Sequence, residues 1–175
     1  LITAMSGIAN KGQLLKPHII KEIKNEDNSI FQEFAVQGVN QVITAEKAQE
    51  LTMMLEKVVS DGGGKLAAVK GYRIAGKTGT AEKLNDNGIG YKAGHYIASF
   101  CGFAPVENPQ VAVLVVLDDP DGKYYGGEIA APIAGGIFEQ VLRYLNIKPA
   151  YVVDIQPTNS GGNVAMPSPP VTING

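Results

Sequence analysis

The sequence is poor in cysteine, in surplus basic charge and in long apolar runs, and each shortage excludes a class of protein. The single cysteine, Cys101, can form neither an internal disulfide nor a zinc cluster built from cysteines. The formal net charge of −2 makes a nucleic acid an unlikely principal partner. No run of 18 apolar residues and no basic segment ahead of an apolar one occurs, so neither a membrane span nor a signal peptide is recognisable.

The composition predicts one globular domain followed by a tail. A chain of 175 residues of which 45% are hydrophobic can bury one core. After Pro149 the sequence becomes rich in proline, glycine and serine, as linkers are. We therefore expect a domain over residues 1–149 and a tail or linker over residues 150–175. The chain opens inside an apolar helical pattern without an initiator methionine, which suggests a piece of a longer protein.

Hydrophobic periodicity and turn signals predict an order of elements. In chain order, we expect a helix that ends at residue 9, a surface hairpin over 18–23 and 29–34, a helix from the N-cap Thr44 to the glycines 62–64, a strand over 72–81, a long loop over 83–94, a hairpin over 97–104 and 111–117, and a helix from about 128–132 to 145. The run at 111–117 is apolar on both faces, so helices are expected on both sides of the sheet.

Residues 71–78 satisfy the phosphate-binding loop pattern G-x-x-x-x-G-K-[ST]. The apolar run at 111–117 also ends in Asp118, as does the strand that holds magnesium in nucleotide hydrolases. A phosphate loop, however, requires a buried strand before its first glycine and a helix that begins at its Lys-Thr pair, and neither is predicted here. The pattern keeps a nucleotide hydrolase as an alternative function, although its structural context is missing. A non-catalytic interaction module is a second alternative.

Residues 77–80, Lys-Thr-Gly-Thr, favour one edge of an acyl-transfer site. The cationic Lys77 can favour a carboxylate substrate. Thr78 and Thr80 occupy alternate positions of a strand, so their hydroxyls point to the same side. Gly79 carries no side chain, and an extended strand there can offer backbone N–H groups to a developing oxyanion.

The sequence around this motif resembles the C-terminal part of the transpeptidase domain of class B penicillin-binding proteins, within the serine β-lactamase and penicillin-binding protein superfamily. The matching segments are residues 71–81, 98–105, 108–109, 124–127 and 130–132, in the order typical of the family. The resemblance covers about residues 1–148. It implies an α+β fold with an antiparallel five-stranded sheet between helices, incomplete in this chain, and acyl transfer from D-Ala-D-Ala stem peptides in cell-wall crosslinking.

The resemblance also implies roles for the motif. Lys77 assists proton transfer and electrostatics at the nucleophile, Thr78 and Thr80 hold the carboxylate of a stem peptide or a β-lactam, and the Thr80 N–H donates to the oxyanion. Substrate-binding residues are thus Lys77, Thr78, Gly79 and Thr80, of which Lys77 and Thr80 are also catalytic. The family further needs a serine three residues before a lysine and a serine two before an asparagine, and no serine of this chain has either spacing.

We therefore expect the chain alone to be inactive. The expected partners are the upstream half of the same domain, peptidoglycan stem peptides and β-lactams, with other wall-synthesis proteins as candidates. The expected location is the outer face of a bacterial membrane, with the anchor upstream. Residues 124–127 are expected either to line the cleft entrance or to pack beneath the last helix.

No metal or cofactor is predicted. His18 and His95 have no carboxylate or cysteine at ligand spacing. Residues 118–122, Asp-Asp-Pro-Asp-Gly, favour a turn at the end of a strand over a cation site.

Overall fold

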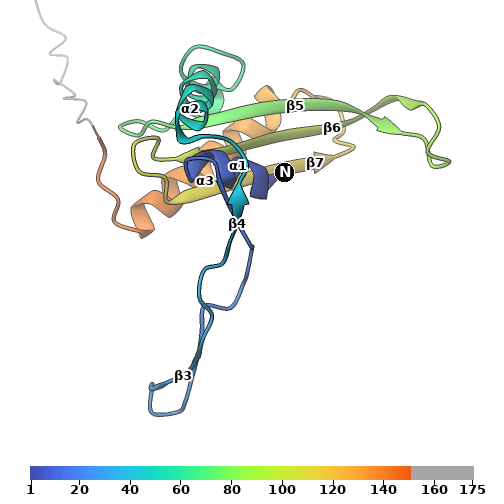
Figure 1. The fold of residues 1–175 in the computed structure, drawn as a ribbon. Coiled ribbons are helices and arrows are strands. Elements are labelled where there is room, and N and C mark those ends of the chain that lie inside the picture. Colours follow the sequence, from blue (N-terminus) through green and yellow to red (C-terminus); the bar gives the residue numbers. More distant parts are fainter. Residues whose placement is uncertain (151–175) are drawn as a thin grey trace, which may run out of the picture.

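A three-stranded antiparallel sheet in the order β5-β6-β7 is the centre of the structure, a computed structural model that describes residues 1–150 (Figure 1). The strands are β5 (Ala75–Leu84), β6 (Tyr91–Ala104) and β7 (Val111–Asp118). Apart from its first residue, the tail predicted for 150–175 lies outside the described residues. Within the described part of the chain, β5 has a ladder partner on one side only, so it is an edge strand.

Helices cover both faces of this sheet, as the sequence predicts. α1 (Ile2–Ala9) packs on one face and α3 (Gly126–Tyr144) on the other (Figure 1). Because successive residues of a strand point to opposite faces, β6 contributes Cys101 and Phe103 to the core under α1 and Phe100 to the core under α3. The core under α3 also contains the buried residues Ile74, Val113, Val115, Ala130, Ala134, Phe138 and Leu142. The predicted α+β architecture is confirmed.

The helix α2 (Ala45–Ser60) lies beside the edge strand β5 (Figure 1). Its predicted N-cap is confirmed, because the Thr44 side chain accepts a hydrogen bond from the Lys47 backbone N–H. Arg73, just before β5, donates two hydrogen bonds of 2.6 and 2.7 Å to the carboxylate of Glu56 on α2. The hydrogen bond from Arg73 holds the pKa of Glu56 below its ordinary value. This pair fixes α2 against the strand that carries the Lys-Thr-Gly motif.

The β5–β6 hairpin is longer than the sequence predicts. Residues 83–94, expected as a loop, extend β5 to Leu84 and begin β6 at Tyr91, which leaves only residues 85–90 as the turn. The Asn85 side chain donates to the Ile89 carbonyl at 2.8 Å and so closes this turn. The strand extensions are short and pair in solvent: Leu84 and Tyr91 lie opposite each other and are 56% and 62% exposed. Because neither face is buried there, the extensions show no alternation of apolar and polar residues.

The helix α3 begins earlier than predicted. We expected its start at residues 128–132, with the proline in the first turn, but it begins at Gly126 and Pro132 lies inside it. The backbone N–H groups of Glu128 and Ile129 both bond to the Tyr125 carbonyl, which starts the helix ahead of the proline. None of the helices in residues 1–150 combines the length and the apolar character needed to cross a membrane.

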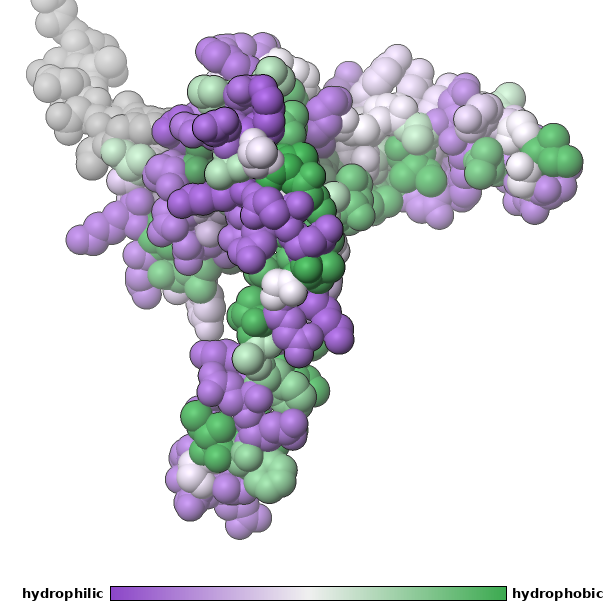
Figure 2. Space-filling view, viewed as in Figure 1, coloured by the Kyte–Doolittle hydropathy of each residue, from purple (hydrophilic) through white to green (hydrophobic). Residues whose placement is uncertain are grey.

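Two short strand pairs form an arm that projects away from the sheet (Figure 1). At its base, β1 (Gln13–Leu15) pairs with β4 (Gly38–Gln41), and further out β2 (Glu22–Lys24) pairs with β3 (Ile30–Glu33). The outer pair confirms the predicted surface hairpin, in shortened form. Figure 2 shows hydrophobic side chains mixed with hydrophilic ones along the arm, and Phe31 is 69% exposed.

Candidate functional site

The Lys-Thr-Gly segment is extended strand throughout. β5 continues through Lys77 and Thr78 to Leu84, so no helix begins at the Lys-Thr pair. The phosphate-loop interpretation requires a helix there, with its amides facing an anion. Asp118, the residue that would hold magnesium in that interpretation, instead bonds Lys83 at 2.7 Å. The geometry therefore argues against the nucleotide hydrolase.

The structure places the predicted site residues on two faces of β5. Thr78 and Thr80 share the face toward the start of α3: a Cβ built on Gly127 would lie 3.7 Å from the Thr78 methyl group, and the Thr80 Oγ1 accepts a hydrogen bond from the Gly126 N–H at 3.1 Å. Lys77 points to the opposite face, the one covered by α1, and its Nζ donates to the Thr78 carbonyl at 2.8 Å. The hydroxyl pair is thus brought together as predicted, and the lysine reaches the same edge from the other side.

Close backbone packing surrounds the motif. A Cβ built on Gly126 would lie 2.3 Å from the Gly79 carbonyl oxygen and 2.4 Å from that of Ser99, and a Cβ on Gly127 would lie 2.3 Å from the Gly63 carbonyl oxygen. The start of α3 is therefore inserted between β5, β6 and the glycine loop after α2. Sequence analysis expected residues 124–127 either to line the cleft entrance or to pack beneath the last helix. It did not predict that Gly126 and Gly127 lie directly against strand backbone, although a double glycine ahead of a helix is a signal of close approach.

Gly79 also packs closely, but against a side chain. A Cβ on Gly79 would lie 2.5 Å from the Ser99 hydroxyl oxygen and 3.9 Å from the Ser99 Cβ. We expect Gly79→Ala to destabilise the fold by about 1–3 kcal/mol through overpacking. Ser99→Ala in the same chain should recover most of that loss, because it removes only the clashing oxygen. Urea unfolding of the single and double variants measures both effects, and equal stability of Gly79→Ala and Gly79→Ala/Ser99→Ala contradicts this account.

Three tyrosines stack at the start of α3, next to the threonine face of β5. The rings of Tyr96 and Tyr124 are 4.0 Å apart and nearly parallel, and the ring of Tyr125 lies 4.5 Å from that of Tyr124. The hydrogen bond with Tyr124 raises the pKa of Tyr125. Tyr125 is 53% exposed, so the stack borders solvent ahead of α3 and does not belong to the core beneath it.

A charged cluster joins the far ends of the three strands. The Nδ1 of His95 lies 2.7 Å from a carboxylate oxygen of Asp119, and the Nζ of Lys83 lies 2.7 Å from Asp118 and 3.8 Å from Asp119. The hydrogen bond with His95 lowers the pKa of Asp119, and that with Asp118 raises the pKa of Lys83. Asp119 adopts a positive φ of 57°, as the predicted turn at 118–122 permits. These interactions link the ends of β5, β6 and β7.

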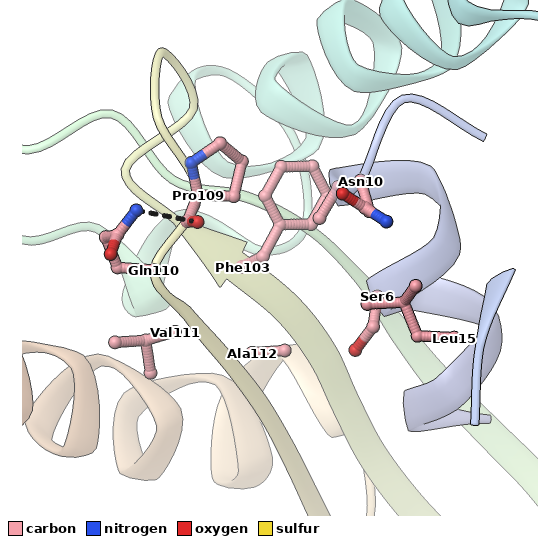
Figure 3. Close-up of a pocket in the computed structure, with 9 residues that line it drawn as sticks. Ser6, Asn10, Leu15, Phe103, Pro109, Gln110, Val111 and Ala112 are labelled. Atoms are coloured by element: carbon pink, nitrogen blue, oxygen red, sulfur yellow. Dashed lines mark hydrogen bonds between the residues drawn. The ribbon is translucent and has the colours of Figure 1, made fainter. Parts of the chain in front are cut away.

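A pocket of about 250 Å³ lies between α1 and the β6–β7 turn (Figure 3). The ring of Phe103 forms its floor between Asn10 and Pro109, and Ser6 and Ala112 line its lower side (Figure 3). Its lining is mostly apolar, and none of the residues 77–80 belongs to it. The pocket is therefore separate from the Lys-Thr-Gly edge.

Comparison with known proteins supports the same interpretation as the geometry. Residues 1–139 match the family described as the penicillin binding protein transpeptidase domain. The stage V sporulation protein D of Bacillus subtilis is 39% identical over 150 residues, which are 85% of this chain and 23% of that protein. The peptidoglycan D,D-transpeptidase FtsI of Escherichia coli is 50% identical over 98 residues, 55% of this chain and 16% of that protein.

Solved structures give the same result. The transpeptidase domain of penicillin-binding protein 3 from Burkholderia pseudomallei superposes with a TM-score of 0.71 at 38% identity, over 86% of this chain and 43% of that one. Penicillin-binding protein 3 from Mycobacterium tuberculosis, complexed with ampicillin, gives a TM-score of 0.75 at 31% identity, over 87% of this chain and 36% of that one. The chain thus spans about a quarter or less of the length of these curated relatives and under half of these solved chains. The family resemblance and the incomplete fold predicted from the sequence are confirmed.

Proposed function

Because the chain belongs to the penicillin-binding protein transpeptidase family, we propose that its residues 1–149 are the C-terminal part of a peptidoglycan D,D-transpeptidase domain and supply one wall of the active site. The observation that carries the proposal is β5, an edge strand that presents Lys77 on one face and the Thr78 and Thr80 hydroxyls on the other. Residues 150–175 then form a linker beyond the domain.

The reaction is a two-step acyl transfer. A serine from the upstream half of the domain attacks the carbonyl carbon of the penultimate D-alanine, the terminal D-alanine leaves as a free amino acid, and an acyl-enzyme forms. The amine of a neighbouring stem peptide then attacks the acyl-enzyme and releases the serine. The reaction with a β-lactam stops at the acyl-enzyme, because the leaving amine stays attached to the acyl group after the ring opens.

The motif residues stabilise the nucleophile, bind the acyl donor and stabilise its oxyanion in this scheme. The Lys77 ammonium stabilises negative charge at the nucleophile and assists its proton transfer. The Thr78 and Thr80 hydroxyls donate hydrogen bonds to the terminal carboxylate of the acyl donor. The Thr80 backbone N–H donates to the oxyanion, and Gly79 leaves the strand free of a side chain beside that oxygen.

The partners and the location follow from the same proposal. Among the solved relatives, penicillin-binding protein 3 of Mycobacterium tuberculosis was determined with aztreonam and with ampicillin, which supports β-lactams as ligands of the complete domain. The upstream half of the domain is the first partner of this chain, and other wall-synthesis proteins are further candidates. We place the complete protein at the outer face of a bacterial membrane, anchored upstream of Leu1.

The decisive test compares this chain with the longer protein that contains it. Each is incubated with a fluorescent penicillin and examined by intact-mass spectrometry. We expect a covalent adduct on the longer protein and none on the isolated chain, because no serine here has the required spacing. An adduct on the isolated chain would refute the account of the missing nucleophile, whereas an unlabelled longer protein would refute the transpeptidase assignment itself.

A further inference from the structure

We propose that Gly126 is a positioning residue, whose backbone N–H fixes the Thr80 hydroxyl so that its proton is offered to the carboxylate of the acyl donor. The inference rests on the proposed function of β5. Its basis is the hydrogen bond of 3.1 Å from the Gly126 N–H to the Thr80 Oγ1, which joins residues 46 apart in the sequence.

The direction of this hydrogen bond determines what Thr80 can do next. A threonine hydroxyl has one proton and two lone pairs, and a backbone N–H can only donate. The contact with Gly126 therefore uses a lone pair and leaves the hydroxyl proton free. A carboxylate is an acceptor only, so a hydroxyl held in this way is ready to bind it.

The packing around Gly126 shows that the contact depends on glycine. A Cβ there would lie 2.3 Å from the Gly79 carbonyl oxygen, 2.4 Å from the Ser99 carbonyl oxygen and 3.1 Å from the Ser99 nitrogen. All three are backbone atoms of paired strands, so none can rotate away. Any other residue moves the start of α3 outward and lengthens the hydrogen bond to Thr80.

The place of Gly126 in α3 strengthens the contact. Gly126 is the first residue of the helix, and the first N–H groups of a helix have no partner within it. The partial positive charge at this helix end polarises the Thr80 oxygen and makes its proton a stronger donor to an anion. Without this contact the Thr80 side chain is free to populate its other staggered rotamers.

The test exploits the charge of the ligand. In the longer protein, acylation rates are measured for a penicillin and for its methyl ester, which keeps the β-lactam ring and loses the carboxylate charge. The preference for the acid over the ester is the readout, because general damage to the fold slows both compounds alike. We expect Gly126→Ala to lower this preference about 10- to 100-fold, the range expected from losing a hydrogen bond to a charged group.

A second variant removes the N–H and adds no atom. An ester in place of the Tyr125–Gly126 amide deletes the donor without the backbone clash, and we expect it to lower the acid preference like Gly126→Ala. Gly136→Ala in the same helix is the control, since a Cβ there meets nothing within 4 Å; it should leave the preference unchanged. In a Thr80→Val background the ester should cause no further loss of acid preference, because the Gly126 N–H then has no hydroxyl to position.

The outcomes separate the two proposals. If the ester variant retains the acid preference of the wild type, or if it slows the acid and the methyl ester equally, Gly126 does not position Thr80. If the unmodified longer protein reacts with neither compound, the transpeptidase assignment fails before Gly126 is tested.

Discussion

Replacing Lys77 by alanine in the longer protein is expected to slow acylation by penicillin about 10²- to 10⁴-fold, the range typical of removing a proton-transfer or charge-stabilising group from an active site. Lys77 lies on an edge strand, and its side chain is exposed and bonds only the carbonyl of the next residue in the described structure. Its removal therefore loses little packing. Stopped-flow or gel measurement of the acylation rate, with the melting temperature alongside, separates a chemical effect from a structural one.

Lys83→Ala is the matched control for this prediction. Lys83 lies on the same strand and the same face as Lys77, but it bonds Asp118 and Asp119 at the far end of the sheet. Exposed ion pairs contribute little to stability, so we expect Lys83→Ala to change the acylation rate less than tenfold. Equal losses in the two variants would show that general positive charge along β5 matters, and that Lys77 has no specific role.

Sequence reasoning placed correctly those elements whose buried faces produce a periodic pattern of apolar residues in the sequence. The helix α2 has an apolar face and a capping Thr44. The strands at 97–104 and 111–117 are apolar because most of their side chains pack into the cores on the two sides of the sheet. The turn at 118–122 was predictable for a different reason, since Asp and Gly tolerate its positive φ values.

Sequence reasoning missed the extensions of β5 and β6 because they have no buried face. Leu84 and Tyr91 pair in solvent, so no buried face imposes an alternation of apolar and polar residues there. The polar and glycine residues around them are typical of a loop. The base of the arm is equally short, and its strand β4 is exposed along its whole length.

The candidate site also has one part that the sequence predicts and one part that only the structure shows. That Thr78 and Thr80 share a face follows from strand alternation alone. That the shared face meets Gly126 depends on a contact across 46 residues, which no local pattern encodes. The same alternation places Lys77 on the other face of β5. Only the structure shows that α1 covers that face and that α3 covers the face of the two threonines.

Phe100→Ala is expected to cost about 3–5 kcal/mol of unfolding free energy, the range for removing a buried phenylalanine. Phe100 is 0% exposed, and its ring lies against three glycines: a Cβ would lie 2.4 Å from the ring at Gly76, 2.9 Å at Gly102 and 3.4 Å at Gly64. Glycines have no side chains that could move into the space, so we expect the upper part of the range. Phe31→Ala, on the exposed arm, should change stability by no more than about 0.5 kcal/mol in the same urea titration.

The contact between Phe100 and Gly76 should also appear as a coupling energy. In the wild type, Gly76→Ala places a methyl group 2.4 Å from the Phe100 ring and overpacks the core directly beneath Lys77. In the Phe100→Ala background the same methyl group enters the vacated space, so its cost should fall or change sign. A double-mutant cycle by urea unfolding measures this coupling. Strictly additive losses would mean that the Phe100 ring does not support β5 at the motif, and that the strand keeps its position there through its ladder with β6 alone.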